Sequence, residues 1–180
     1  MTERPAIEPS EIVFDRTGAV REERLPGPWL RFLARAFDYA LFLLFLSSFH
    51  LFFPKFVIKP MRLPWEFVAW VPIEAILLAC WGKTVGKWFL KIGVRQGRRE
   101  RPSLLSACRR SISVWFRGVG MMIPLLNGLC MFIAFVAWQR TKTTSWDRDE
   151  GITLFSQPIG RWRVVFASLV SAALFLIYWV

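Results

Sequence analysis

The sequence predicts an all-α membrane protein: a small polytopic helical bundle with an amphipathic arginine helix or hairpin and a minor cytoplasmic β element. Three observations support this fold class: four long apolar stretches, basic residues gathered between them, and arginines on one face of a further helix. Hydrophobic residues make up 54% of the 180 residues, and aromatic residues make up 16%. A soluble domain of this size cannot bury so much apolar surface, so lipid is the expected surrounding.

Each apolar stretch has close to the ~20 residues that a helix needs to cross the hydrocarbon of a bilayer. The stretches cover residues 36–53, 63–81, 121–138 and 164–180. Tryptophans lie near their ends, where interfacial aromatic residues are expected. These are Trp29, Trp65, Trp81, Trp138, Trp162 and Trp179.

The net charge of +11 indicates the orientation and the partners. Residues 82–110 carry nine basic side chains against the single acid Glu100, whereas residues 54–62 carry three basic side chains. The positive-inside rule then places 82–110 and the N-terminus in the cytoplasm and 54–62 outside. Because the basic residues lie between apolar stretches, we expect the bilayer and its anionic headgroups as partners, and no nucleic acid.

Residues 103–120 form an amphipathic segment when drawn as a helix, with Arg109 and Arg110 on its polar face. Such a helix can lie flat among headgroups. Alternatively it enters the membrane and returns through 121–138, turning at 124–128. We expect the returning hairpin, because it keeps the following basic loop in the cytoplasm. A shallow re-entrant form stays open.

Two short segments of the loops have the composition of strands. They are residues 91–95 (KIGVR), followed by the turn-like GRRERP, and residues 151–155 (GITLF). With both loops in the cytoplasm, the two segments can pair beneath the bundle.

Ionisable residues within the apolar helices are the candidate site, because a charge in hydrocarbon needs a partner or a function. Arg31, Arg35 and Asp38 share one narrow helical face. At 1.5 Å per residue, Asp38 lies ~12 Å and Glu74 ~10 Å from the cytoplasmic edge, so the two carboxylates reach similar depth. In the hairpin form, the arginine pair reaches that depth too. The expected intramembrane polar cluster consists of Arg31, Arg35, Asp38, Glu74, Arg109 and Arg110.

This cluster has more than one interpretation. Arginine–carboxylate pairs can satisfy buried charges and fix the register of the helices. Alternatively, Asp38 and Glu74 form a pair that handles a proton or a cation, since two close carboxylates favour protonation of one of them. Binding of a headgroup or another anion is a third interpretation.

Short motifs follow one another in a fixed order along residues 28–155. The first helix begins with an Arg, an Ala three residues on and an Asp seven on, which are Arg31, Ala34 and Asp38. The second carries an acid and then a T-x-G-K turn, with Glu74, Thr84, Gly86 and Lys87. LKIGVRQ, ACRRS and TTSWDRDEGITLF follow, the last with Trp146, Asp147 and Thr153. In order and spacing, these motifs resemble the RDD family of membrane proteins, named for one Arg and two Asp.

The resemblance implies a helical membrane domain whose molecular role is poorly defined. Some relatives are linked to cation/proton antiport and others to complexes with partner proteins, so other membrane protein subunits are expected partners. The resemblance also implies family-type residues on the cytoplasmic side, which are Thr84, Gly86, Lys87, Asp147 and Thr153.

We expect three regions: a flexible cytoplasmic tail (1–28), an RDD-like membrane domain (29–157) and an additional transmembrane helix (158–180). The expected location is the bacterial cytoplasmic (inner) membrane, with several crossings. The expected function is a scaffold, assembly or partner-binding module. The alternatives are a cation/proton antiporter and an anionic-lipid or signal-binding module.

The sequence does not suggest an enzyme. It has no Ser/His/Asp set, no paired His ligands and no nucleophile turn. The three cysteines and the lone His50 lack the spacing of a metal site. We therefore expect no catalytic residue, metal or cofactor.

Overall fold

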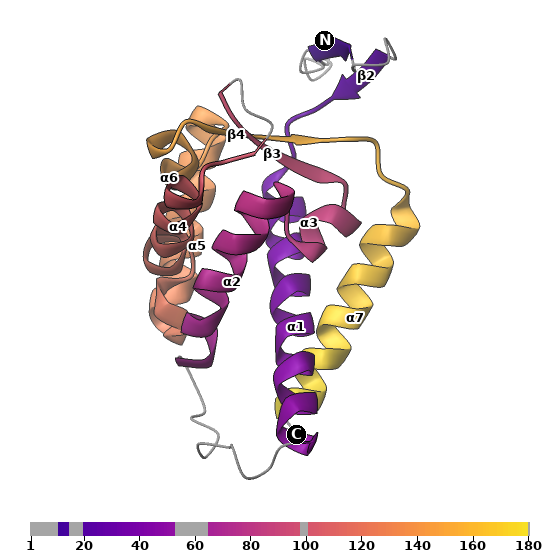
Figure 1. Cartoon of the computed structure of the whole chain (residues 1–180), viewed down its shortest axis with the longest axis vertical. Helices are drawn as coiled ribbons and strands as arrows, with labels where there is room; N and C mark the ends of the chain where they lie inside the picture. The colour runs from indigo at the N-terminus through magenta and orange to yellow at the C-terminus, as the bar shows by residue number, and fades with distance from the viewer. Residues whose placement is uncertain (1–10, 15–19, 53–64, 98–100, 180) are drawn as a thin grey trace, which may run out of the picture.

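The computed structural model describes residues 11–14, 20–52, 65–97 and 101–179 (Figure 1). Most of them are helical. The helices are α1 (Pro28–Phe52), α2 (Trp65–Trp81), α3 (Val85–Phe89), α4 (Leu104–Ser113), α5 (Pro124–Thr141), α6 (Ser145–Asp149) and α7 (Arg161–Trp179). A π-helical turn, η2 (Val114–Gly118), and a 3₁₀ turn, η3 (Gly120–Met122), follow α4. The strands are β1 (Glu11–Phe14), β2 (Val20–Glu23), β3 (Ile92–Gln96) and β4 (Ile152–Ser156).

The four apolar stretches correspond to the four long helices α1, α2, α5 and α7. Within the described part of the chain, one segment, Pro28–Phe49 of α1, is long and apolar enough to cross a membrane by length and composition, with a mean hydropathy of 1.5. Val68–Trp81 of α2 is a shorter apolar helix. Helix α1 begins earlier than its apolar stretch, so it includes Arg31 and Arg35.

Helix α1 is the central element, and it packs against α7 on one side and α3 on another. Small residues allow these close approaches, because Ala34 of α1 and Ala167 of α7 are both fully buried in the same core cluster. Leu78 of α2 and Leu90, which follows α3, complete that cluster near the strands. Helix α2 in turn packs against α4.

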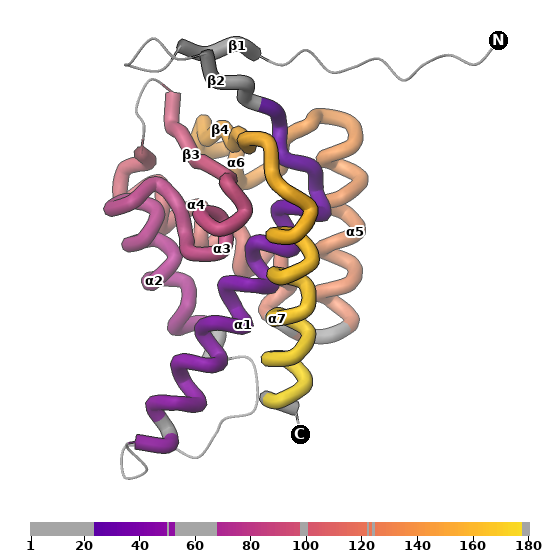
Figure 2. Tube along the Cα trace, turned by 90° about the vertical axis from the view of Figure 1, so that its right-hand side faces the viewer, coloured from indigo at the N-terminus to yellow at the C-terminus, as the bar shows by residue number. Residues whose placement is uncertain are grey.

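Residues 104–141 form a helical hairpin in which α4 and η2 descend from the strand end and α5 returns to it (Figure 2). The turn lies at Gly120 and Met121, with φ of 56° and 54°, and not at 124–128 as expected. A Cβ at Gly120 would lie 2.7 Å from the backbone of Leu126. Pro124 instead begins α5, where its missing N–H and fixed φ are tolerated.

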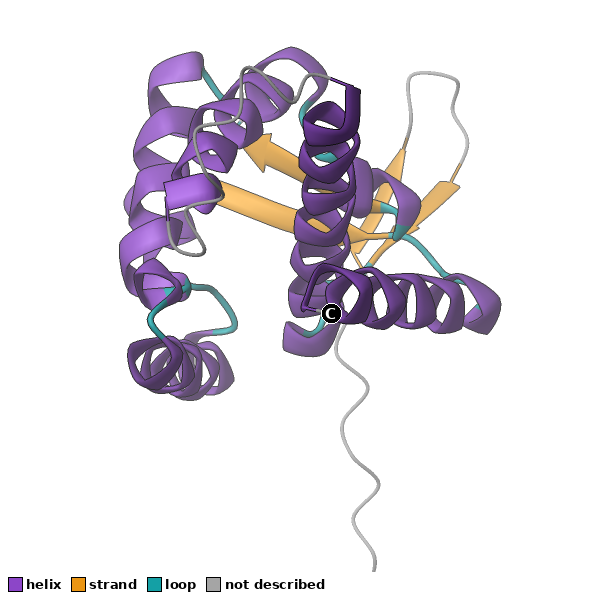
Figure 3. Ribbon diagram, turned by 90° about the horizontal axis from the view of Figure 1, so that it is seen from below, coloured by secondary structure: helices purple, strands orange, loops and turns teal. Residues whose placement is uncertain are grey.

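Strands β3 and β4 pair antiparallel, one residue further along the chain than the segments expected from the sequence. Gly93 lies opposite Phe155 in this register. A Cβ at Gly93 would overlap the Phe155 ring, so the glycine makes room for it. The Arg95 guanidinium lies 4.1 Å from the centre of the same ring. Figure 3 shows these strands behind the helices, at the far end of the bundle.

The segment expected to be a flexible tail contains a second strand pair in its described part. β1 and β2 are antiparallel, with Val13 opposite Arg21. Arg24 and Ser156 then exchange two backbone hydrogen bonds of 3.0 and 2.7 Å, which join this segment to β4. The polar composition of residues 1–28 suggested a tail, but the run EIVF contains β-branched residues that favour a strand.

Candidate functional site

The candidate site begins where Asp38 of α1 meets the start of α3. Thr84 donates its hydroxyl to Oδ2 of Asp38 at 2.5 Å, and the Gly86 N–H donates to Oδ1 at 2.6 Å. Thr84 has an extended backbone and is the N-cap of α3, and its Oγ1 accepts from the Lys87 N–H at 3.5 Å. Asp38 is 3% exposed, so these neutral donors satisfy a buried carboxylate.

Gly86 is required by the close approach of α3 to α1. A Cβ at this position would overlap the carbonyl oxygen of Ala34 and lie 3.0 Å from the Asp38 carboxyl. The small residues Ala34 and Gly86 therefore let the two backbones come close together. This approach brings the Gly86 N–H within reach of the Asp38 carboxylate.

Glu74 of α2 lies among three cationic side chains. Its Oε1 accepts from Lys87 Nζ at 3.1 Å and from Arg110 Nη1 at 3.3 Å, and Arg35 Nη2 lies 3.7 Å away. Burial lowers the pKa of the Lys87 amine, and the neighbouring Glu74 carboxylate opposes this shift. The contact between Lys87 and Glu74 is an ion pair.

Arg110 of α4 connects Glu74 to Asp147 of α6. Its Nε donates to Oδ1 of Asp147 at 2.8 Å, and its side chain is 2% exposed. Asp147 also accepts from the Thr144 hydroxyl at 2.6 Å, and Arg31 Nη1 lies 3.5 Å from its Oδ2. Arg31 Nε donates to the carbonyl of Pro26 at 3.1 Å.

These contacts form one buried charge network that joins five helices. It consists of Arg31, Arg35, Asp38, Glu74, Thr84, Gly86, Lys87, Arg110, Thr144 and Asp147. When every charged member is ionised, four cations (Arg31, Arg35, Lys87 and Arg110) oppose three carboxylates (Asp38, Glu74 and Asp147). The network therefore carries one positive charge in excess.

Five of the six residues expected in the intramembrane cluster belong to this network, but Arg109 does not. Arg109 is exposed, whereas the next residue, Arg110, is buried. Successive residues on a helix differ by about 100°, and here Arg109 points away from the side on which Arg110 is buried. The inclusion of Arg109 was therefore wrong.

The resemblance implied a set of family-type residues on the cytoplasmic side. Of these residues, Thr84, Gly86, Lys87 and Asp147 make direct contacts with members of the expected cluster. Thr153 does not, because it is an exposed residue of β4 opposite Arg95. The sequence reasoning also missed Thr144, whose position three residues before Asp147 is a capping spacing that could have identified it.

Asp38 and Glu74 accept hydrogen bonds from different groups. Helix α3 supplies donors to both, through Thr84 and Gly86 on one side and Lys87 on the other. The arrangement can therefore neutralise each acid separately.

The sequence model of the RDD family matches residues 25–149. No curated protein and no solved structure matches the chain. The matched range begins before Arg31 and ends after Asp147, so it contains every member of the buried charge network.

Proposed function

This chain belongs to the RDD family and is an integral membrane protein, and from that premise we propose that it is a scaffold or partner-binding module of the bacterial inner membrane. In this proposal the buried charge network fixes one arrangement of the helices, which presents their outer faces to other membrane subunits. The proposal includes no enzymatic step and no cofactor.

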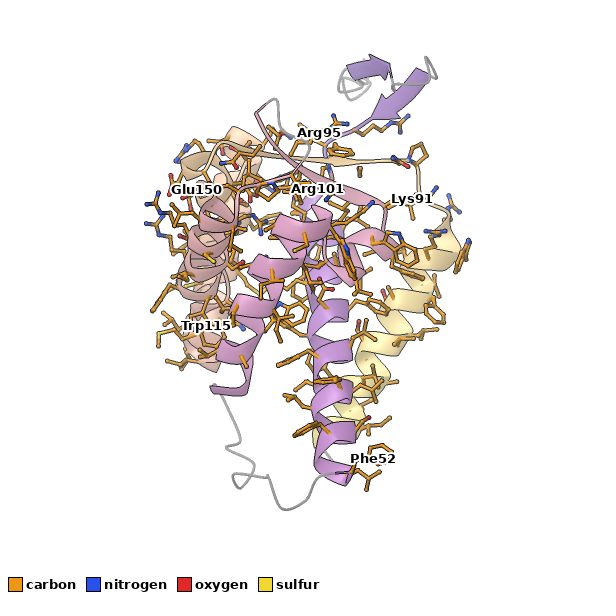
Figure 4. All side chains as sticks on the ribbon, in the orientation of Figure 1. Phe52, Lys91, Arg95, Arg101, Trp115 and Glu150 are labelled. Carbon is orange, nitrogen blue, oxygen red and sulfur yellow. The ribbon has the colours of Figure 1, made fainter. Side chains whose placement is uncertain are left out.

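The proposed topology has several crossings and a cytoplasmic N-terminus. Lys91, Arg95 and Arg101 lie at the strand end of the bundle, and Phe52 lies at the opposite end (Figure 4). The positive-inside rule favours the cytoplasm for the strand end. At 1.5 Å per residue, α1 is roughly 38 Å long and α2, α5 and α7 are roughly 26–29 Å, comparable to a hydrocarbon core of about 30 Å.

The observation that carries the scaffold role is the contact of buried Arg110 with both Glu74 and Asp147. Each of these carboxylates already has charged partners, so a transported cation would have to displace an arginine or a lysine. A buried network of ion pairs and hydrogen bonds can fix register, which is the best-attested use of such groups. This favours a structural role for Glu74 and Asp147.

The test of the scaffold role measures assembly in intact membranes. We expect chemical crosslinking of intact membranes to give a discrete complex larger than the 21.0 kDa chain. Arg110→Gln should weaken that complex, and the matched control Arg109→Gln should preserve it. Absence of any complex, with well-folded protein, would contradict the scaffold role.

Cation/proton antiport is a second candidate because of one observation on Asp38. Among the described residues, its hydrogen-bond donors are the neutral Thr84 hydroxyl and Gly86 N–H. Asp38 is thus the carboxylate of the network that a proton or cation could neutralise without displacing a direct ion pair. A sodium-dependent pH change in vesicles containing the wild type, removed by Asp38→Asn without loss of protein, would support this candidate against the scaffold role.

A further inference from the structure

A cavity of about 630 Å³ lies beside the buried charge network, between α1 and the hairpin of η2 and α5. Aromatic side chains form much of its wall, including Trp29, Phe32, Phe132 and Phe135. The rings of Trp29 and Phe135 lie 6.3 Å apart. The volume is within the range of ligand pockets, about 300–1,000 Å³, which are usually apolar with a few well-placed polar groups.

The polar part of the cavity wall comes from the network itself, through Arg31, Arg35, Lys87, Arg110 and Asp147. The Arg35 side chain is 21% exposed and lies 3.7 Å from Glu74, beyond hydrogen-bond distance. The Arg31 side chain is 14% exposed, and its ion pair with Asp147 is 3.5 Å long. Both guanidinium groups have further N–H donors beyond these contacts, since each carries five.

Trp138 also lines the cavity, near the end of α5, which returns to the strand end where α1 begins. Its indole N–H is buried and has no hydrogen-bond partner among the described residues. Because the surrounding protein covers this nitrogen, Trp138 contributes ring surface to the cavity wall and no hydrogen-bond donor.

We propose that this cavity binds an anionic phospholipid, with its phosphate at Arg31 and Arg35 and an acyl chain against the aromatic wall. A singly charged phosphodiester matches the one positive charge that the network has in excess. Arg31 and Arg35 lie roughly 4.5 and 10.5 Å along α1 from Pro28, near the helix end that the proposed topology places at the cytoplasmic membrane surface.

The cavity fits an amphiphile better than the other possible occupants. A small hydrated anion would gain nothing from the aromatic walls. A partner helix, about 10–12 Å in diameter, would fill the volume within about two turns and could not run along it. Trp29 and Phe132 are both largely exposed, so the walls extend to the lipid-facing surface and a chain can enter from the bilayer.

The test measures lipid retention by the full chain. The protein is reconstituted with equal amounts of phosphatidylglycerol and phosphatidylcholine of the same acyl chains, extracted into detergent, and examined by native mass spectrometry. We expect at least a tenfold preference for one phosphatidylglycerol per chain, and we expect excess inorganic phosphate not to displace it.

Three variants locate the site. Arg35→Gln should lower phosphatidylglycerol retention at least fivefold, and Phe132→Ala, which removes one ring of the aromatic wall, about threefold. Arg109→Gln is the matched control, because that arginine is exposed outside the cavity, and it should retain the lipid fully. Phe132→Ala leaves the charge network intact, so it remains informative if Arg35→Gln does not fold.

Three outcomes would overturn the proposal: equal retention of both lipids by the wild type, displacement by inorganic phosphate, or an equal loss in Arg109→Gln, which would indicate general attraction to basic residues. The proposal does not depend on the scaffold role, because lipid retention is measured on the isolated chain and complex formation in intact membranes.

Discussion

Arg110 Nε and Asp147 Oδ1 lie 2.8 Å apart, although the two residues are 37 positions apart in the sequence. Both are almost fully buried, and the pair joins α4 of the hairpin to the short helix α6 that follows it. Because Arg110 also reaches Glu74 on α2, one guanidinium connects two acids on separate helices. This geometry leads to the following predictions.

Replacing Arg110 with Met should be strongly destabilising, whereas the same change at Arg109 should have little effect. Without Arg110, the Asp147 and Glu74 carboxylates lose a buried partner, and breaking a buried pair costs about 3–5 kcal/mol. Arg109 is exposed on the same helix, so it is a control of equal chemistry. Thermal unfolding in detergent measures both variants. Equal melting temperatures for the two would contradict the position of Arg110 in the network.

Replacing Gly86 with Ala should disturb the packing of α3 on α1. The new Cβ would overlap the Ala34 carbonyl oxygen, and overpacking of this kind costs about 1–3 kcal/mol. Gly128→Ala is the control, since a Cβ there meets nothing within 4 Å. Folded yield and melting temperature should fall for Gly86→Ala alone. A stable Gly86→Ala protein would show that the two backbones are further apart.

If Asp38 has a structural role, Asp38→Asn should destabilise the protein less than Asp38→Ala. Asn preserves an acceptor for one of the two donors, while Ala leaves both the Gly86 N–H and the Thr84 hydroxyl without their acceptor. Each unsatisfied buried group costs about 1–3 kcal/mol. In detergent, Asp38→Asn should therefore unfold at a higher midpoint than Asp38→Ala. Equal midpoints would argue against the hydrogen bonds to α3.

Cysteine labelling tests the proposed orientation. In a background with Cys80, Cys108 and Cys130 replaced by Ala, Arg95→Cys and Phe52→Cys place single thiols at opposite ends of the bundle. A membrane-impermeant maleimide added outside intact cells should label position 52, and position 95 should react only after the membrane is opened. The reverse pattern would invert the proposed topology.

Hydropathy predicted the long helices well, because a segment of nearly 20 apolar residues in a chain of this size has few possible structures other than a long helix. Helix periodicity likewise placed Arg31, Arg35 and Asp38 on one face, and all three belong to the buried charge network. The strand pair of β3 and β4 was found to within one residue. These features depend on local pattern, which a single sequence contains.

Contacts between segments that are far apart in the sequence were not predictable from local patterns. The contact of Lys87 with Glu74 was not expected, because a short segment such as α3 has too few residues to show a helical period. Arg109 and Arg110 were both predicted to belong to the cluster, since both lie on one broad polar arc of α4. Only the packing of α4 against α2 and α6 decides which of them is buried.

A double-mutant cycle between Arg110 and Asp147 tests the buried charge network most directly. The free energy of unfolding is measured for the wild type, Arg110→Met, Asp147→Asn and the double variant. We predict a coupling energy of about 1–3 kcal/mol, because the second substitution removes a partner that is already lost. Strictly additive effects of the two substitutions would contradict a direct interaction, and with it the network that joins the helices.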